Sequence, residues 1–260
     1  MSSDFSVIAE SDEARIKSPH KTGGTQCWGT LCLVLIAYNG KLCKKERFPN
    51  LPSDPMAQSE EYRLSFTSGG LLLQESTRIA TLHSQTGDWS RTRECAVADN
   101  LLQARSPSSS VRRVGEVCAR LRMLTERQLA LFQEPMQVDQ LLLLWLAVCK
   151  RYAILREFAD EVVRSHFLSL QLVLSREEFD RFLEKKSVWH PKIEGLADST
   201  RAKLARAAYQ MLSEAGLISQ ELVIQPVLLS RELARAIVAD DIELLHVYPI
   251  ADADVPGAGR

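Results

Sequence analysis

Apolar residues recur at helical spacing along most of the chain after residue 70. Within residues 111–124, for example, Val114, Val117 and Leu121 fall on one face at 3.6-residue spacing. Segments with this pattern and with suitable boundary residues predict helices over 71–85, 89–98, 111–124, 135–167, 176–186, 201–215 and 231–239. The segment 135–167 is either one long helix or two nearly continuous ones. The pattern therefore predicts an all-α protein.

Several boundary residues have the chemistry of helix caps. Residues of N-cap type stand before four of the predicted helices: Asp88, Ser175, Ser199 with Thr200, and Ser230. Ser175 is followed by Glu178 at the spacing of a capping box. Gly216 is suited to end the helix that Ser199 or Thr200 begins. Residues 217–229 are rich in β-branched side chains and are a candidate small hairpin.

Residues 1–55 differ from the rest of the chain. They lack a hydrophobic period, and Pro49, Pro52 and Pro55 forbid a continuous helix there. We interpret them as a disordered extension or an upstream mis-start, with Met56 as the alternative start of the protein. The predicted organisation is an extension over 1–55, an N-terminal helical domain over 56–170, a winged-helix-like helical domain over 171–250 and a loose tail over 251–260. The two helical domains would pack as subdomains.

The composition is that of an ordinary globular protein, with 45% apolar and 25% charged residues. The formal net charge of -1 argues against a uniformly basic protein, so a nucleic-acid site must be a local patch. The six cysteines show neither a disulfide framework nor a zinc pattern, which indicates a reducing, cytoplasmic compartment. The apolar runs 31–38 and 141–149 are shorter than the roughly 20 residues that span a bilayer, so we expect no membrane association. The second run predicts a buried core helix.

The first candidate binding surface is the basic side of the helix over 111–124. Arg113, Arg120 and Arg127 are seven residues apart and fall on one face, opposite the apolar stripe. Ser108–Ser110 offer hydroxyl and backbone N–H groups at the start of this helix, which suits a phosphate. We therefore predict phosphate contacts from Arg105, Ser108, Ser109, Arg112, Arg113 and Arg120. A solvated helix face without a ligand is the alternative.

The second candidate surface is the helix that follows Asp198. Leu204, Ala208 and Met211 point one way, and basic and amide side chains point the other. Such a helix suits the major groove, with the preceding helix as its support and the hairpin as its wing. We predict DNA contacts from Ser199, Thr200, Arg201, Lys203, Arg206 and Gln210. The connection 188–198 is longer than the usual turn of a helix-turn-helix motif, so an amphipathic helix packed on a domain is the alternative.

No enzyme motif is readable in the sequence. The chain lacks a P-loop, a dinucleotide-binding Gly-x-Gly-x-x-Gly and a Gly-x-Ser-x-Gly pattern. The five histidines are scattered, and the adjacent Asp240 and Asp241 do not fix a geometry for acid–base catalysis. We therefore expect a protein that is not an enzyme and that uses no cofactor or metal. Trp89, Trp145 and Trp189 are expected in the core, with stacking of Trp189 on a base as an alternative.

Several blocks of the sequence resemble one family. The segment Tyr-Arg-Leu-Ser-Phe-Thr-Ser-Gly-Gly-Leu-Leu-Leu-Gln-Glu-Ser, residues 62–76, resembles the opening of the BrxA family of the bacteriophage exclusion (BREX) defence systems. Asp88-Trp89 and residues 100–109 resemble the next block of that family, and residues 199–203 with 211–218 resemble its C-terminal block. The resemblance covers about residues 60–249, so residues 1–55 lie outside it.

This resemblance implies an all-helical core component of a phage-defence locus that binds duplex DNA. It places two helix-turn-helix-like elements over Asp88–Leu124 and Ser175–Ala215, the regions that carry the two basic surfaces. We therefore expect a cytoplasmic, non-enzymatic DNA-binding subunit, monomeric outside its complex, with other BREX subunits as partners. One alternative is a protein–protein adaptor within the complex. Because members of the family resemble the RNA-binding antitermination factor NusB, an RNA-binding protein is the other.

Overall fold

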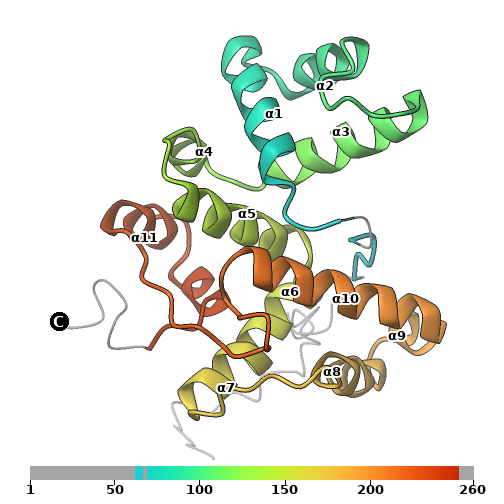
Figure 1. Ribbon diagram of the computed structural model, residues 1–260, viewed down its shortest axis with the longest axis vertical. Coiled ribbons are helices and arrows are strands. Elements are labelled where there is room, and N and C mark those ends of the chain that lie inside the picture. The colour runs from blue at the N-terminus through green and yellow to red at the C-terminus, as the bar shows by residue number, and fades with distance from the viewer. Residues whose placement is uncertain (1–61, 67–68, 252–260) are drawn as a thin grey trace, which may run out of the picture. The chain divides into compact units, whose positions relative to one another are not determined.

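The computed structural model describes residues 62–66 and 69–251, and these residues form an all-helical structure (Figure 1). The predicted extension over 1–55, the possible start at Met56 and the tail beyond residue 251 lie outside the described residues. The elements are α1 (Leu73–Thr86), α2 (Trp89–Ala98), α3 (Pro107–Leu121), α4 (Glu126–Phe132), α5 (Gln137–Arg151), α6 (Ala153–Phe158), the π-helical η2 (Ala159–Arg164), α7 (Ser165–Leu168), α8 (Glu178–Ser187), α9 (Pro191–Glu194), α10 (Asp198–Glu214), α11 (Arg231–Val238) and the 3-10 helix η3 (Ile242–Val247).

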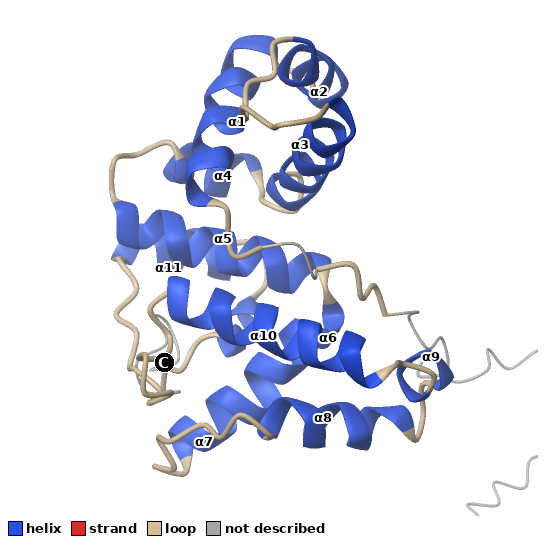
Figure 2. Ribbon diagram, turned by 45° about the vertical axis from the view of Figure 1, so that its right-hand side comes forward, coloured by secondary structure: helices blue, strands red, loops and turns tan. Residues whose placement is uncertain are grey.

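The first three helices form a bundle above α5 (Figure 2). The predicted cap of α2 is confirmed, because the Asp88 side chain accepts a hydrogen bond from the Arg91 N–H. Helix α3 begins earlier than predicted: Ser106 is its N-cap and Pro107 its first residue, a position that suits proline. Helix α4 was not predicted, although Thr125 and Gln128 have the sequence spacing of a capping box and form one in the structure.

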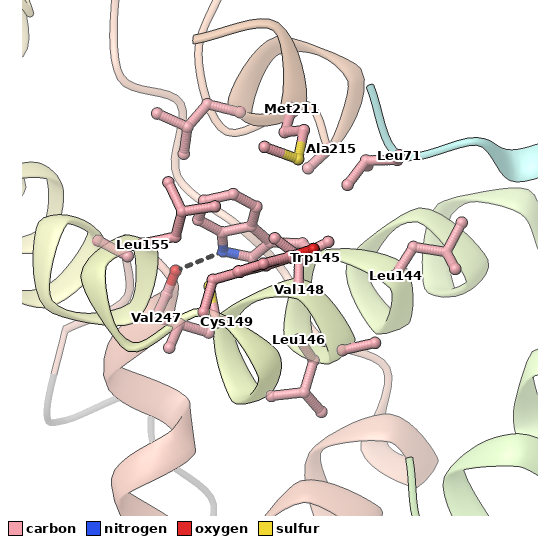
Figure 3. Packing of buried hydrophobic residues seen from close by; sticks show 14 of the residues in the cluster. Leu71, Leu144, Trp145, Leu146, Val148, Cys149, Leu155, Met211, Ala215 and Val247 are labelled. Atoms are coloured by element: carbon pink, nitrogen blue, oxygen red, sulfur yellow. Dashed lines mark hydrogen bonds between the residues drawn. The ribbon is translucent and has the colours of Figure 1, made fainter. Parts of the chain in front are cut away.

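Helix α5 lies between α3 on one side and α10 on the other, and it forms the centre of the core (Figure 2). Its residues 142–149 are all buried, which confirms the predicted core helix. Trp145 donates from Nε1 to the Val247 carbonyl at 2.9 Å. Figure 3 shows this bond, with Met211 of α10 packed over the other side of the indole. The helix therefore joins the N-terminal bundle to the elements at the C-terminal end.

The predicted segment 135–167 consists of two helical stretches and not one. The chain leaves helical geometry at Tyr152, where φ is −121° and ψ is 91°. The Tyr152 side chain is fully buried, with its ring edge against Phe66 and its hydroxyl donating to Glu116. Beyond the break, α6, η2 and α7 continue to Leu168. Tertiary packing of Tyr152 thus interrupts a segment whose apolar pattern is continuous.

The C-terminal half contains α8, α9 and α10, and two of its predicted helix caps are wrong. Ser175 is not the N-cap of α8, which begins at Glu178 without a side-chain cap bond. Helix α10 begins at Asp198, so Ser199 and Thr200 lie inside its first turn and cap nothing. Gly216, at φ 74°, does follow its end as predicted. Within the predicted hairpin, one isolated antiparallel bridge pairs Ile218 with Ile224, and a second bridge pairs Val223 with Val173, before α8.

The last elements pack back onto α4 and α5. Ser230 caps α11 as predicted, and its hydroxyl also donates to Asp139 of α5 at 2.6 Å. Gln128 of α4 donates to the Ala236 carbonyl at 3.1 Å. Contacts therefore join segments on both sides of residue 170, and the domain boundary that we placed there remains a prediction.

Candidate nucleic-acid interface

The start of α3 carries the first predicted surface. The Ser106 hydroxyl accepts from the Ser109 N–H and donates to the Ser109 hydroxyl at 2.9 Å. The Ser108 hydroxyl lies 3.3 Å from the Ser106 hydroxyl. This hydroxyl cluster fixes the first turn of the helix. Arg105, which directly precedes the N-cap, and Arg112, in the second turn of the helix, are both exposed. The structure thus brings the predicted serines and two of the predicted arginines together at one helix end.

Arg113 stands on the rim of a hollow between α1 and α3. Its guanidinium lies 3.8 Å from Glu75, and its side chain is 48% exposed. The hollow has a volume of about 290 Å³ and is lined by Gly69, Leu72, Glu75, Ser109, Arg112, Arg113 and Glu116. The hollow thus holds two carboxylates, Glu75 and Glu116, together with the guanidinium groups of Arg112 and Arg113. Glu116 is already paired with Arg120 and Arg151.

Arg120 does not belong to this exposed surface. The residue is fully buried, and it donates from Nε to Glu116 at 2.7 Å and from Nη1 to the Gly70 carbonyl at 2.8 Å. The expectation that it contacts phosphate is wrong for this conformation, because no ligand can reach a side chain that is 1% exposed. Its role in the structure is to hold the segment before α1 against α3.

Helix α10 carries the second predicted surface, and its exposed face is polar and basic. Ser199, Lys203, Arg206 and Gln210 are exposed at successive helical turns. On the opposite face, Leu204, Ala208 and Met211 are buried. The side chain of Gln210 donates to Glu214 at 2.8 Å, so this amide is held in place at the C-terminal end of the face. The amphipathic arrangement predicted from the spacing is present.

Arg201 and Thr200 lie at the edge of this face, and both are half-buried. The Arg201 guanidinium turns back towards the preceding loop and donates to the carbonyls of Ile193, Glu194 and Leu196 at 3.2–3.4 Å. These carbonyls lie at the end of α9, where helix carbonyls lack partners within the helix. In this structure Arg201 therefore joins α9 to α10, and the exposed basic side chains of this face are Lys203 and Arg206.

The surroundings of α10 are set by two neighbouring parts of the chain. Tyr209 packs towards α8, and its hydroxyl donates to the Ser175 carbonyl at 2.5 Å. Burial raises the pKa of Tyr209 to about 12, so the phenol keeps its proton. On the other side, the Gln225 N–H donates to the Leu217 carbonyl and the Ile224 N–H to the Leu172 carbonyl. These bonds tie the segment after α10 to the segment before α8.

Two features of the surface were not predicted from the sequence. Between residues 73 and 134 the chain has nine arginines and no lysine, and Arg78, Arg91, Arg93 and Arg122 add exposed positive charge to the bundle. The excess of arginine over lysine in this segment is the sequence signal that indicates this charge. Trp189, expected in the core, is instead 79% exposed beside Val188, which is 73% exposed. Both residues lie in the short link between α8, which ends at Ser187, and α9, which begins at Pro191.

The described residues offer neither a metal site nor a membrane span. Within residues 62–66 and 69–251, no group of three or more His, Cys, Asp or Glu side chains is arranged to hold a metal ion. Among the helices of the same ranges, none has the length and the apolar character that crossing a membrane requires.

The fold and the exposed side chains define an all-helical protein with two separate arginine-bearing helical surfaces. The model of the BrxA family matches residues 60–241, and the chain therefore belongs to the BrxA family. The relative "BREX protein BrxA" of Paramagnetospirillum magneticum is 28% identical over 158 residues, which are 61% of this chain and 79% of the relative. That of Escherichia coli O9:H4 is 27% identical over 150 residues, 58% of this chain and 70% of the relative.

A solved structure has a similar fold. The crystal structure of an uncharacterized protein from Magnetospirillum magneticum superposes with a TM-score of 0.63 and 25% sequence identity. The superposition covers 73% of this chain and 99% of that chain. The shared region therefore includes most of the described helices.

Proposed function

We propose that the chain is a non-enzymatic DNA-binding component of a BREX phage-defence system. Its membership of the BrxA family, and the names of its relatives, support the assignment to such a system. The observation that carries DNA binding is the exposed face of α10, where Lys203 and Arg206 stand outward on a helix whose back is buried. A helix of this kind can enter the major groove and contact base edges.

The elements around α10 support this assignment. A short extended segment, Leu172–Leu174, precedes α8, and two more, Leu217–Ser219 and Leu222–Gln225, follow α10. Leu222–Gln225, the last of the three in sequence, lies between the other two in space, because it is hydrogen-bonded to both. This spatial order of the three segments, with α8 and α9 between the first segment and α10, resembles that of a winged helix and supports the proposal. In such a motif the helix at the position of α10 reads the groove and the paired segments form the wing.

The start of α3 would supply phosphate contacts. Arg112 and Arg113 line one hollow with Ser109, and Arg105 is exposed just before the helix begins. Guanidinium, hydroxyl and backbone N–H groups are the usual donors to DNA phosphates.

A salt titration of duplex binding tests the proposal. If about six phosphates are neutralised, the affinity should fall roughly a thousandfold between about 50 and 200 mM salt. The variant Lys203→Ala with Arg206→Ala should bind more weakly and discriminate less between sequences. A matched control is Arg231→Ala with Arg235→Ala, two exposed arginines on α11. Absence of duplex binding by the unaltered protein at low salt would overturn the proposal.

A protein–protein adaptor is the second candidate, and the exposed pair of Val188 and Trp189 favours it. Tryptophan is enriched among the residues that dominate protein interfaces, and an exposed one is uncommon on a monomer. Trp189→Ala should then release another BREX subunit without changing duplex affinity. Competition between duplex DNA and structured RNA distinguishes the remaining possibility, an RNA ligand, from both.

A further inference from the structure

One peptide group links the two helices that carry the basic surfaces. The Gly70 carbonyl accepts from Nη1 of Arg120, on α3, at 2.8 Å. The N–H of the same peptide unit, which belongs to Leu71, donates to Oε2 of Glu214, on α10, at 2.5 Å. The carbonyl and N–H of a trans peptide point in opposite directions, so the unit lies between a cation and an anion. Hydrogen bonds with a charged partner are about twice as strong as neutral ones.

Glycine is required at the centre of this link. A Cβ atom at residue 70 would collide with the Glu214 carboxylate, so any other residue must displace that side chain. Gly69, at φ 96°, lies in the region that L side chains rarely adopt. The Gly-Gly pair thus lets the backbone approach Glu214 closely enough to donate.

Both ends of the link are held by further contacts. On the α3 side, Nε of Arg120 donates to Glu116 at 2.7 Å, and the Tyr152 hydroxyl donates to the same carboxylate at 2.5 Å. Burial first, and then the bond to Glu116, raise the pKa of Tyr152, so this donor keeps its proton. On the α10 side, Gln210 donates to the other oxygen of Glu214 at 2.8 Å. The network therefore runs from the core at Tyr152 to the exposed face of α10.

We infer that Gly70 and Glu214 are positioning residues that hold α3 and α10 as one rigid two-part nucleic-acid surface. The inference rests on the proposed function. Helix α5 packs against both helices through buried apolar residues, which are not directional contacts, and on the α3 side its Arg151 also lies 3.6 Å from Glu116. The peptide link adds direction to that packing. When the link is rigid and the first surface is bound, the second surface is held close to the same duplex. Its contact then has a high effective concentration, which raises the joint affinity.

The test measures duplex affinity for variants of the peptide link in two backgrounds. In the intact background, we expect Glu214→Ala to weaken binding by about tenfold, because the second surface then has a lower effective concentration. In a background that carries Arg112→Ala and Arg113→Ala, the same change should weaken binding by less than about twofold, since there is no second surface to align. Equal losses of affinity in both backgrounds would overturn the inference, because they indicate a general structural defect.

Two further variants sharpen the result. Glu214→Gln keeps an acceptor for the Leu71 N–H and should bind within about twofold of the unaltered protein. Gly70→Ala should match Glu214→Ala, and the double variant should be no weaker than either, because both changes remove the same bond. Additive losses of affinity in the double variant would contradict a shared link.

Hydrogen exchange separates this inference from the proposed function. The Leu71 amide should exchange slowly in the unaltered protein and at least about tenfold faster in Glu214→Ala, with the amides of α5 unchanged. This readout needs no DNA, so it stands if duplex binding is absent. An unchanged Leu71 exchange rate would overturn the link even if the protein binds DNA.

Discussion

Arg113 and Arg120 lie seven residues apart on α3, yet the side chain of Arg113 is 48% exposed and that of Arg120 is 1% exposed. We expect Arg120→Ala to lower the free energy of unfolding by about 3 kcal/mol or more, because it leaves the Gly70 carbonyl buried without its donor. Arg113→Ala should lower it by less than about 1 kcal/mol. Urea denaturation of the two variants measures the difference, and similar losses of stability would mean that Arg120 is not buried in solution.

The exposed arginines at the start of α3 make a second prediction, about binding. Arg112→Ala with Arg113→Ala should weaken binding to all duplex sequences alike and reduce the salt slope by about two, one for each arginine that no longer neutralises a phosphate. Fluorescence anisotropy at several salt concentrations measures the slope. The α11 pair Arg231→Ala with Arg235→Ala removes the same charge and should leave the slope unchanged. A slope that falls equally in both variants would indicate a general charge effect and no site at α3.

Serine residues at the starts of α3 and α10 make a third prediction, about helix caps. The Ser106 side chain accepts from the Ser109 N–H, so Ser106→Ala should destabilise the protein by about 1 kcal/mol. Ser199 makes no cap bond at the start of α10, so Ser199→Ala should change stability by less than about 0.5 kcal/mol. Thermal unfolding compares the two. If Ser199→Ala were the more destabilising, Ser199 would cap α10 in solution.

Local signals explain why most helices could be predicted from the sequence. Asp88, Ser230 and Gly216 act within a few residues of themselves, and the structure confirms all three boundaries. The continuous burial of residues 142–149 follows in the same way from their uninterrupted apolar run. Helical periodicity and helix capping depend on residues a few positions apart, so both can be identified from a single sequence.

Long-range contacts explain what could not be predicted. Arg120 has the spacing of a surface stripe, but its partner Gly70 is 50 residues away, and Glu214 is 143 residues from the Leu71 N–H whose hydrogen bond it accepts. The break at Tyr152 likewise depends on Glu116, 36 residues earlier. Nothing in the local pattern of residues 111–124 distinguishes Arg120 from Arg113. For the candidate site, the sequence therefore predicts the exposed face of α10 better than the arginine stripe of α3.

The stacked pair of His83 and Trp89 makes a fourth prediction, about pH. Their ring centroids are 3.7 Å apart, and His83 Nδ1 lies 3.1 Å from the Thr92 hydroxyl. Burial lowers the pKa of His83 below its usual 6.5, although the nearby Asp88 opposes the shift. The unfolded chain therefore binds a proton more readily than the folded protein, so this residue stabilises the fold above pH 6.5 and less as the pH falls through that value.

This pH dependence can be measured by comparing the unaltered protein with His83→Phe. Phenylalanine keeps a ring against Trp89 but cannot take up a proton. Urea denaturation at a series of pH values between about 5 and 8 should show a steeper loss of stability on acidification for the unaltered protein than for the variant. Equal slopes in the two proteins would mean that His83 has the same proton affinity in the folded and unfolded states.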